Sequence, residues 1–225
     1  MAKETKEELQ QEKIQETVSK TETFLNENKN TIYTAVAVVL VIAASILCYQ
    51  KFYLQPKKAE AAAQMYPAEA AFAAQNYEVA LKGDGNNLGF EQIIDEYGSK
   101  ASQAATLYAG ICEFNLGNFE SAITYLKKYK GTDEILAARA AACIGDAYVG
   151  LEDYKTALGY FEKAAGVIDN IYAATYLLKA GEVCEALGNK DKALKFYKQI
   201  KEKYPQTMEG YDIDKYISRI ENKAE

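Results

Sequence analysis

The sequence predicts an all-α protein in which a single transmembrane helix precedes a solenoid of helical hairpins and a C-terminal capping helix. Three observations support this fold class. Residues 31–49 (TIYTAVAVVLVIAASILCY) carry no charge, small residues recur later at intervals of 35 and 36 positions, and the 225 residues include only three Pro. A recurrence at this period is typical of stacked helical repeats.

The first element is a charged N-terminal tail over residues 1–30. It contains seven acidic residues and five Lys. A few apolar residues stand among the charges, so a weakly amphipathic helix and a solvated, partly disordered tail are both compatible with it. The tail is too long and too acidic for the short basic start of a cleaved signal peptide, and we expect the apolar run behind it to remain as an anchor.

The second element is a transmembrane helix over residues 31–54, which we expect to contact the lipid bilayer. A helix needs roughly 20 apolar residues to cross a membrane. Tyr33 at one end and Tyr49, Phe52 and Tyr53 at the other match the aromatic belts of membrane interfaces. A buried core helix is the alternative. The lysines flanking the run differ by one between the two sides, a bias toward a cytoplasmic C-terminal domain that is too small to assign the orientation.

The third element is a soluble domain over residues 55–225, which contains about four helical hairpins. Their expected bounds are 60–100, 103–136, 138–172 and 174–205, followed by a cap over 207–223. The first hairpin is a weaker copy with an insertion, GDGNNLG (83–89), which is rich in Gly and Asn and is a poor continuation of a helix.

Small residues at recurring positions indicate where the helices of this domain approach each other. They are Gly110, Gly145 and Gly181 on first helices, and Ala80, Ala122, Ala157 and Ala193 on second helices. Gly in a helix costs about 1 kcal/mol relative to Ala, so its recurrence points to a close neighbour. We expect Leu126, Phe161 and Tyr197 to fill the space between successive pairs, giving a common core that no single hairpin forms alone.

This pattern resembles the tetratricopeptide repeat (TPR) family over residues 60–205. The residues that carry the resemblance best are Gly145, Tyr148, Tyr154, Ala157, Phe161 and Ala164, with Pro205 closing the last hairpin. The chain departs from the family pattern because it has no Trp and because Glu113 and Cys184 replace an aromatic residue. A generic alanine-rich helical bundle is the alternative.

The resemblance implies a concave groove, lined by the first helix of each hairpin, that binds other proteins. Its expected lining is Met65, Glu69, Phe72, Leu107, Ile111, Phe114, Arg139, Asp146, Leu178 and Glu182. For each of these residues the alternative is packing against a neighbouring helix. The lining is apolar near the membrane end and acidic farther along, which suits an amphipathic helix or an unfolded hydrophobic segment.

Composition excludes several classes of function. The chain has no His, so it lacks the pairs and motifs that build histidine-dependent nucleophiles and zinc proteases. Its four Cys form no CxxC pair, and we expect Cys112, Cys143 and Cys184 to pack as small hydrophobes, with a disulfide left open in an oxidising compartment. The net charge of −6 disfavours nucleic acid. We therefore expect no enzyme activity, no cofactor, no metal and no small-molecule substrate.

The whole layout is similar to that of the bacterial ancillary SecYEG translocon subunits, which are membrane-anchored periplasmic TPR-like proteins. In addition, the stretch EVALKGDGNNLGFEQIIDEYGSKA (78–101) resembles membrane-anchored TPR proteins of the Bacteroidetes group. These resemblances imply the bacterial inner membrane, a cytoplasmic N-terminus and a periplasmic C-terminal domain. They also imply translocon subunits, periplasmic chaperones or unfolded clients as partners. A structural scaffold for another cell-envelope complex is the alternative function.

Overall fold

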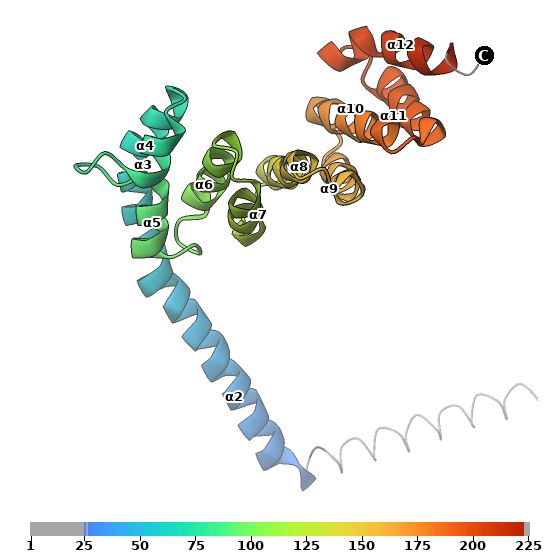
Figure 1. Cartoon of the computed structure of the whole chain (residues 1–225). Coiled ribbons are helices and arrows are strands. Elements are labelled where there is room, and N and C mark those ends of the chain that lie inside the picture. Colours follow the sequence, from blue (N-terminus) through green and yellow to red (C-terminus); the bar gives the residue numbers. More distant parts are fainter. Residues whose placement is uncertain (1–24, 26, 223–225) are drawn as a thin grey trace, which may run out of the picture. The chain divides into compact units, whose positions relative to one another are not determined.

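The computed structural model describes residues 25 and 27–222, drawn as ribbons in Figure 1. The charged tail predicted over residues 1–30 lies almost entirely outside the described residues. The chain divides into two compact units, residues 1–55 and residues 56–225, and each is described by itself.

The first unit contains α2 (Lys29–Cys48) and the π-helical turn η1 (Tyr49–Leu54). None of the 20 residues of α2 is buried, and Val39, Leu40 and Val41 are each more than 60% exposed. The described residues contain one helix that is long and apolar enough to cross a membrane, and α2 is its apolar part. At the end of this part, Tyr49 and Tyr53 stack with ring centroids 5.2 Å apart.

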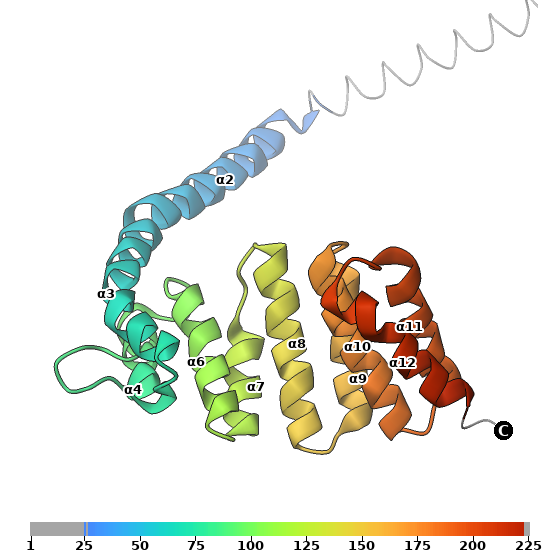
Figure 2. The same ribbon diagram turned by 90° about the horizontal axis from the view of Figure 1, so that it is seen from above.

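The second unit is an all-α solenoid, as predicted. Its helices are α3 (Gln55–Ala73), α4 (Tyr77–Lys82), α5 (Phe90–Tyr97), α6 (Gln103–Asn115), α7 (Phe119–Lys128), α8 (Glu134–Gly150), α9 (Tyr154–Val167), α10 (Ile171–Ala186), α11 (Lys190–Lys203) and α12 (Met208–Glu221). The pairs α6–α7, α8–α9 and α10–α11 follow one another along the solenoid (Figure 2). The described residues contain no β-strand.

The turns within the pairs follow from local sequence. Gly117 and Gly188 adopt φ values of 83° and 75°, which end α6 and α10 in the left-handed conformation that favours Gly. The corresponding turn after α8 places Glu152 at φ 60°, although the left-handed region is less favourable for a residue with a Cβ atom. The next helices then begin at capping side chains: Asp153 accepts from the backbone N–H of Thr156, and Asn189 caps α11 in the same way.

The helices of a pair approach each other most closely at the recurring glycines. A Cβ atom added at these three positions would lie only 2.6, 2.7 and 2.1 Å from a side-chain atom of the second helix. The contacts join Gly110 to Leu126, Gly145 to Phe161 and Gly181 to Tyr197. These large side chains therefore occupy the space within each pair, whereas the sequence analysis expected them between successive pairs.

The recurring alanines lie on the second helices of the pairs. They are Ala80, Ala122, Ala157 and Ala193, and all four are fully buried. A methyl side chain at these positions leaves room for the backbone of the neighbouring helix, which is why the same residue type recurs.

The insertion at residues 83–89 divides the second helix of the first pair into α4 and α5. Within this loop the Asp84 carboxylate accepts hydrogen bonds from the backbone N–H groups of Asn86 and Asn87, at 2.9 and 2.7 Å. Hydrogen bonds from Asn87 lower the pKa of Asp84. The two ends of the loop are in contact, because a Cβ atom added at Gly89 would lie 2.3 Å from the backbone N of Gly83.

The core of the second unit continues through the stacked pairs to α12. This last helix buries Ile213, Ile217 and Ile220, which join the cluster formed by α9, α10 and α11. Cys112 and Cys184 are fully buried in the core. All four cysteines are free.

Candidate protein-binding surface

The first helices α6, α8 and α10 lie on one side of the solenoid, and the second helices α7, α9 and α11 lie on the other (Figure 1). The sequence analysis expected a groove along the first helices. The exposed part of this side, which we call the first-helix face, is formed here by residues of α8 and α10: Arg139, Asp146, Leu178, Lys179 and Glu182.

Three residues expected to line the groove are part of the core instead. Met65, Leu107 and Ile111 are only 5%, 5% and 7% exposed. Leu107 and Ile111 pack in a cluster with residues of α7 and α8, including Ile144. The expectation for these three positions was therefore wrong, because their apolar side chains are covered by neighbouring helices and are not available to a partner.

Phe72 and Phe114 are partly buried by other aromatic rings. The ring centroid of Phe72 lies 4.9 Å from that of Tyr108 on α6, and the centroid of Phe114 lies 5.8 Å from that of Phe119 on α7. Both rings therefore link one helix to another. Glu69, on α3, is half-buried and lines a small pocket beside α6.

The expected residues on α8 and α10 are exposed or half-buried. Arg139 and Glu182 are exposed, while Asp146 and Leu178 are half-buried. Both oxygens of the Asp146 carboxylate accept hydrogen bonds of 2.7 Å from the Nζ of Lys179, so this ion pair ties α8 to α10. Such a bidentate contact restrains both side chains.

Asp146 and Glu182 share a pocket of about 280 Å³ at the junction of α8, α9 and α10. The residues around it are Asp146, Val149, Tyr154, Phe161, Lys179, Glu182, Val183 and Ala186. Its walls are mostly apolar and its rim carries two acids and one base. Partial burial raises the pKa of the Glu182 carboxyl. A pocket of this kind can accept an apolar side chain of a partner together with a neighbouring basic group.

Sequence reasoning missed Lys179, Tyr154 and Val183 in this pocket. Lys179 follows Asp146 by 33 positions, close to one repeat length, and an acid and a base at that spacing on successive first helices could have indicated the ion pair. Tyr154 was identified only as one of the residues that match the repeat pattern. No signal in the sequence shows that its ring reaches the pocket.

Among the residues that the structure describes, no group of three or more His, Cys, Asp or Glu side chains could hold a metal ion. The ionisable groups of the pocket are instead arranged as an ion pair and one exposed carboxyl group. This arrangement can bind a polypeptide surface.

Comparison with known proteins agrees with this architecture. A family model described as "Tetratricopeptide repeat-like domain" matches residues 22–213. The crystal structure of MamA is similar over 69% of this chain and 84% of that chain, with a TM-score of 0.55 and 18% sequence identity, which shows a shared fold. A search of curated proteins found no match. The family model covers most of the chain, and this protein therefore belongs to the tetratricopeptide repeat-like domain family.

Proposed function

We propose that this protein is a membrane-anchored interaction module that holds a TPR-like solenoid beside a bilayer and binds partner proteins through its first-helix face. The observation that carries the proposal is the combination of two features in one chain. The apolar helix α2 has no buried residue, and a solenoid of a family built for protein binding follows it within a few residues. The module acts by binding alone, without a cofactor.

We further propose that the module belongs to the ancillary subunits of a translocon or to the periplasmic chaperone network of a bacterial inner membrane. In this arrangement the N-terminus is cytoplasmic and the solenoid is periplasmic. The layout described above supports the proposal. The family match over residues 22–213 supports the repeat architecture on which this proposal rests.

Membrane topology provides the first test. Protease added to intact spheroplasts should digest the solenoid if it lies outside the inner membrane, while an internal cytoplasmic marker protein stays intact. Digestion of the solenoid only after the inner membrane is opened would place it in the cytoplasm and would contradict the periplasmic assignment.

Partner capture provides the second test. The full chain, purified in mild detergent after chemical crosslinking, should recover translocon or chaperone subunits. Glu182→Arg should reduce the recovery of these subunits because it changes the charge of the pocket shared by Asp146 and Glu182, which we call the first-helix pocket. Glu202→Arg on α11, outside this pocket, should not reduce it. A capture dominated by one unrelated envelope complex would instead favour a structural scaffold. Equal effects of the two variants would show that the pocket shared by Asp146 and Glu182 is not the partner-binding site.

A further inference from the structure

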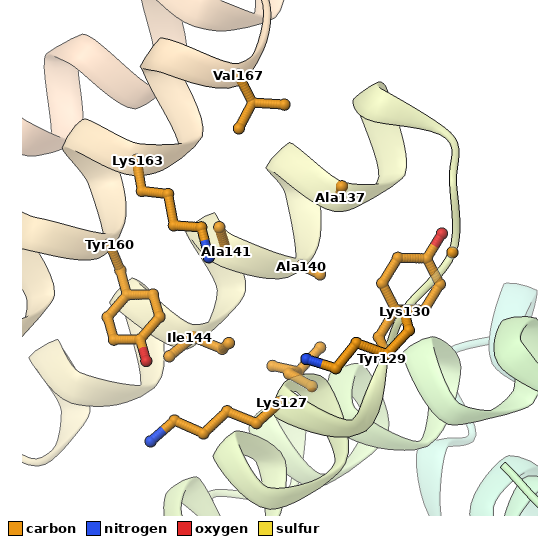
Figure 3. A pocket seen from close by; sticks show the side chains of 12 residues that line it. Lys127, Tyr129, Lys130, Ala137, Ala140, Ala141, Ile144, Tyr160, Lys163 and Val167 are labelled. Carbon is orange, nitrogen blue, oxygen red and sulfur yellow. The ribbon is translucent and has the colours of Figure 1, made fainter. Parts of the chain in front are cut away.

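A second recess lies among the second helices, away from the pocket described above. It is a furrow of about 600 Å³ between α7 and α9, with α8 as its floor (Figure 3). We call it the α7–α9 furrow. The residues that form it include Lys127, Tyr129, Lys130, Ala137, Ala140, Ala141, Ile144, Tyr160, Lys163 and Val167.

The side chains of the floor are short because most of the residues that α8 contributes to the furrow are alanines. Ala137, Ala140 and Ala141 lie on consecutive turns, with Ile144 at one end. Larger residues at these positions would fill the space between α7 and α9. The floor is therefore apolar and mostly buried: Ala140, Ala141 and Ile144 are 5%, 6% and 5% exposed, and the half-buried Ala137 is the floor residue on which an aliphatic side chain of another molecule can rest.

Three lysines on separate elements surround this floor. Lys127 comes from α7, Lys130 from the connection to α8, and Lys163 from α9. Lys130 and Lys163 extend from opposite sides toward the alanines in Figure 3. The Nζ of Lys127 donates a hydrogen bond of 3.1 Å to the hydroxyl of Tyr148, which keeps this amine at the edge of the furrow.

These lysines differ from several basic residues in the C-terminal part of the solenoid. Lys179, Lys192, Lys198 and Lys201 each lie 2.7–3.1 Å from a carboxylate oxygen. By contrast, none of the three furrow lysines forms an ion pair within the part of the chain that the structure describes.

Asp133 is an acidic residue close to the furrow. Asp133, close enough to Tyr129 to affect the pKa of its hydroxyl, is the N-cap of α8 and accepts the backbone N–H of Leu136 at 2.9 Å. This hydrogen bond restrains the carboxylate but leaves its charge in place, so the three lysines of the furrow stand beside this acid. The furrow is a positively charged recess in a chain whose net charge is −6.

We propose that the α7–α9 furrow binds an acidic peptide segment of a partner protein, with carboxylates beside the three lysines and an adjacent apolar side chain on the alanine floor. Charge complementarity selects the acidic groups, and the apolar floor favours a peptide over an isolated anion. This surface is separate from the first-helix face, and it would let the solenoid hold two partners, or two segments of one partner, at once.

The test uses the full chain in a neutral detergent and a fluorescein-labelled peptide of alternating leucine and glutamate, followed by fluorescence anisotropy. A matched peptide of alternating leucine and glutamine is the uncharged control. We expect saturable binding of the acidic peptide that weakens as salt is added, because exposed charges are screened. Equal binding of the two peptides would overturn the proposal.

Variants locate the binding site. The double variant Lys130→Gln and Lys163→Gln should lower the affinity for the acidic peptide about tenfold, since each exposed ion pair contributes up to about 1 kcal/mol. Lys128→Gln is the matched control, because Lys128 lies on α7 against the ring of Tyr125 and outside the furrow. Equal affinities of the double variant and this control would overturn the proposal.

Two further measurements separate the alternatives. Ala137→Leu should block peptide binding by filling the floor while leaving the melting temperature unchanged within a few degrees. Inorganic phosphate or phosphatidylglycerol vesicles that bind with the same lysine dependence, in the absence of peptide binding, would show an anion or lipid site and overturn the peptide assignment. Glu182→Arg should not change the affinity for the acidic peptide. A wrong assignment of the furrow can therefore be distinguished from a wrong assignment of the first-helix pocket.

Discussion

At the scale of single residues, the solenoid depends on glycines that sit directly against large side chains. Of the three recurring helix glycines, Gly181 is the most constrained, because an added Cβ atom would lie 2.1 Å from the Tyr197 ring. That ring is fully buried, and its hydroxyl donates a hydrogen bond of 2.7 Å to Glu185. The ring therefore has little freedom to move aside, and the glycine is required by packing.

We expect Gly181→Ala to lower the free energy of unfolding by about 1–3 kcal/mol, the usual result of overpacking a core. Gly159→Ala is the matched control. Gly159 also lies inside a helix, but nothing stands within 4 Å of an added Cβ atom, so this change should stabilise by about 0.5–1 kcal/mol. Urea denaturation of the full chain in detergent measures both. Equal effects would contradict the packing role of Gly181.

The buried thiol of Cys112 and the half-buried thiol of Cys143 should react slowly in the folded protein. Burial raises the pKa of Cys112 to about 12 and that of Cys143 to about 11. A raised thiol pKa means that the folded state favours the protonated form, and the thiolate that reacts is scarce at pH 8. We expect alkylation of Cys112 and Cys143 at pH 8 to be much slower in the native chain than in urea, as measured by mass spectrometry. Fast native labelling of Cys112 would contradict its burial.

The sequence identified the close contacts better than the binding surface. Gly in a helix interior is unfavourable, so its recurrence at Gly110, Gly145 and Gly181 has one simple physical cause. An apolar stripe has two physical causes, which are packing against a neighbouring helix and the lining of an open groove. Leu107 and Ile111 form a regular stripe on α6, but in a solenoid the same helix contacts its own partner and the next pair, and periodicity alone does not separate these contacts from an open groove.

At the scale of elements, the turns and caps determine where each helix begins and ends. Gly117 and Gly188 end α6 and α10 in the left-handed conformation that favours Gly, and the residue type alone is a signal for such helix ends. The π-helical turn η1 and the interrupted second helix of the first pair could be anticipated less well. The composition of residues 83–89 indicates a break, but it does not show that α5 resumes packing against α6.

The capping side chain of α11 gives a test at this scale. Asn189→Ala removes the hydrogen bond from the backbone N–H of Lys192, 3.1 Å from Asn189 Oδ1, and we expect a loss of about 1 kcal/mol of stability. The comparison variant is Asn222→Ala, which follows the last helix and caps no N-terminus. Thermal unfolding of the full chain should show a lower midpoint for Asn189→Ala alone. A shift of the same size in the comparison variant would show that the cap is not responsible.

At the scale of the whole molecule, the last helix covers the end of the core. Ile213 is 1% exposed on α12, whereas Met208 on the same helix is 85% exposed. We expect Ile213→Ala to cost about 2–5 kcal/mol, the range for deleting a buried aliphatic side chain, and Met208→Ala to change stability by less than about 0.5 kcal/mol. Hydrogen exchange of the backbone amides in α10 and α11 measures whether the loss of stability caused by Ile213→Ala spreads from α12 to the neighbouring helices. A similar cost for both variants would contradict the covering role of α12.

The pattern of helix contacts also bears on how the chain is made. The strongest contacts join helices that are neighbours or next neighbours in the sequence, such as α8 with α9 and α9 with α10. Folding that depends on such local contacts is fast and can begin at any repeat. A polypeptide emerging N-terminus first can therefore add one hairpin after another to the stack during its own synthesis, without waiting for the C-terminal residues to appear.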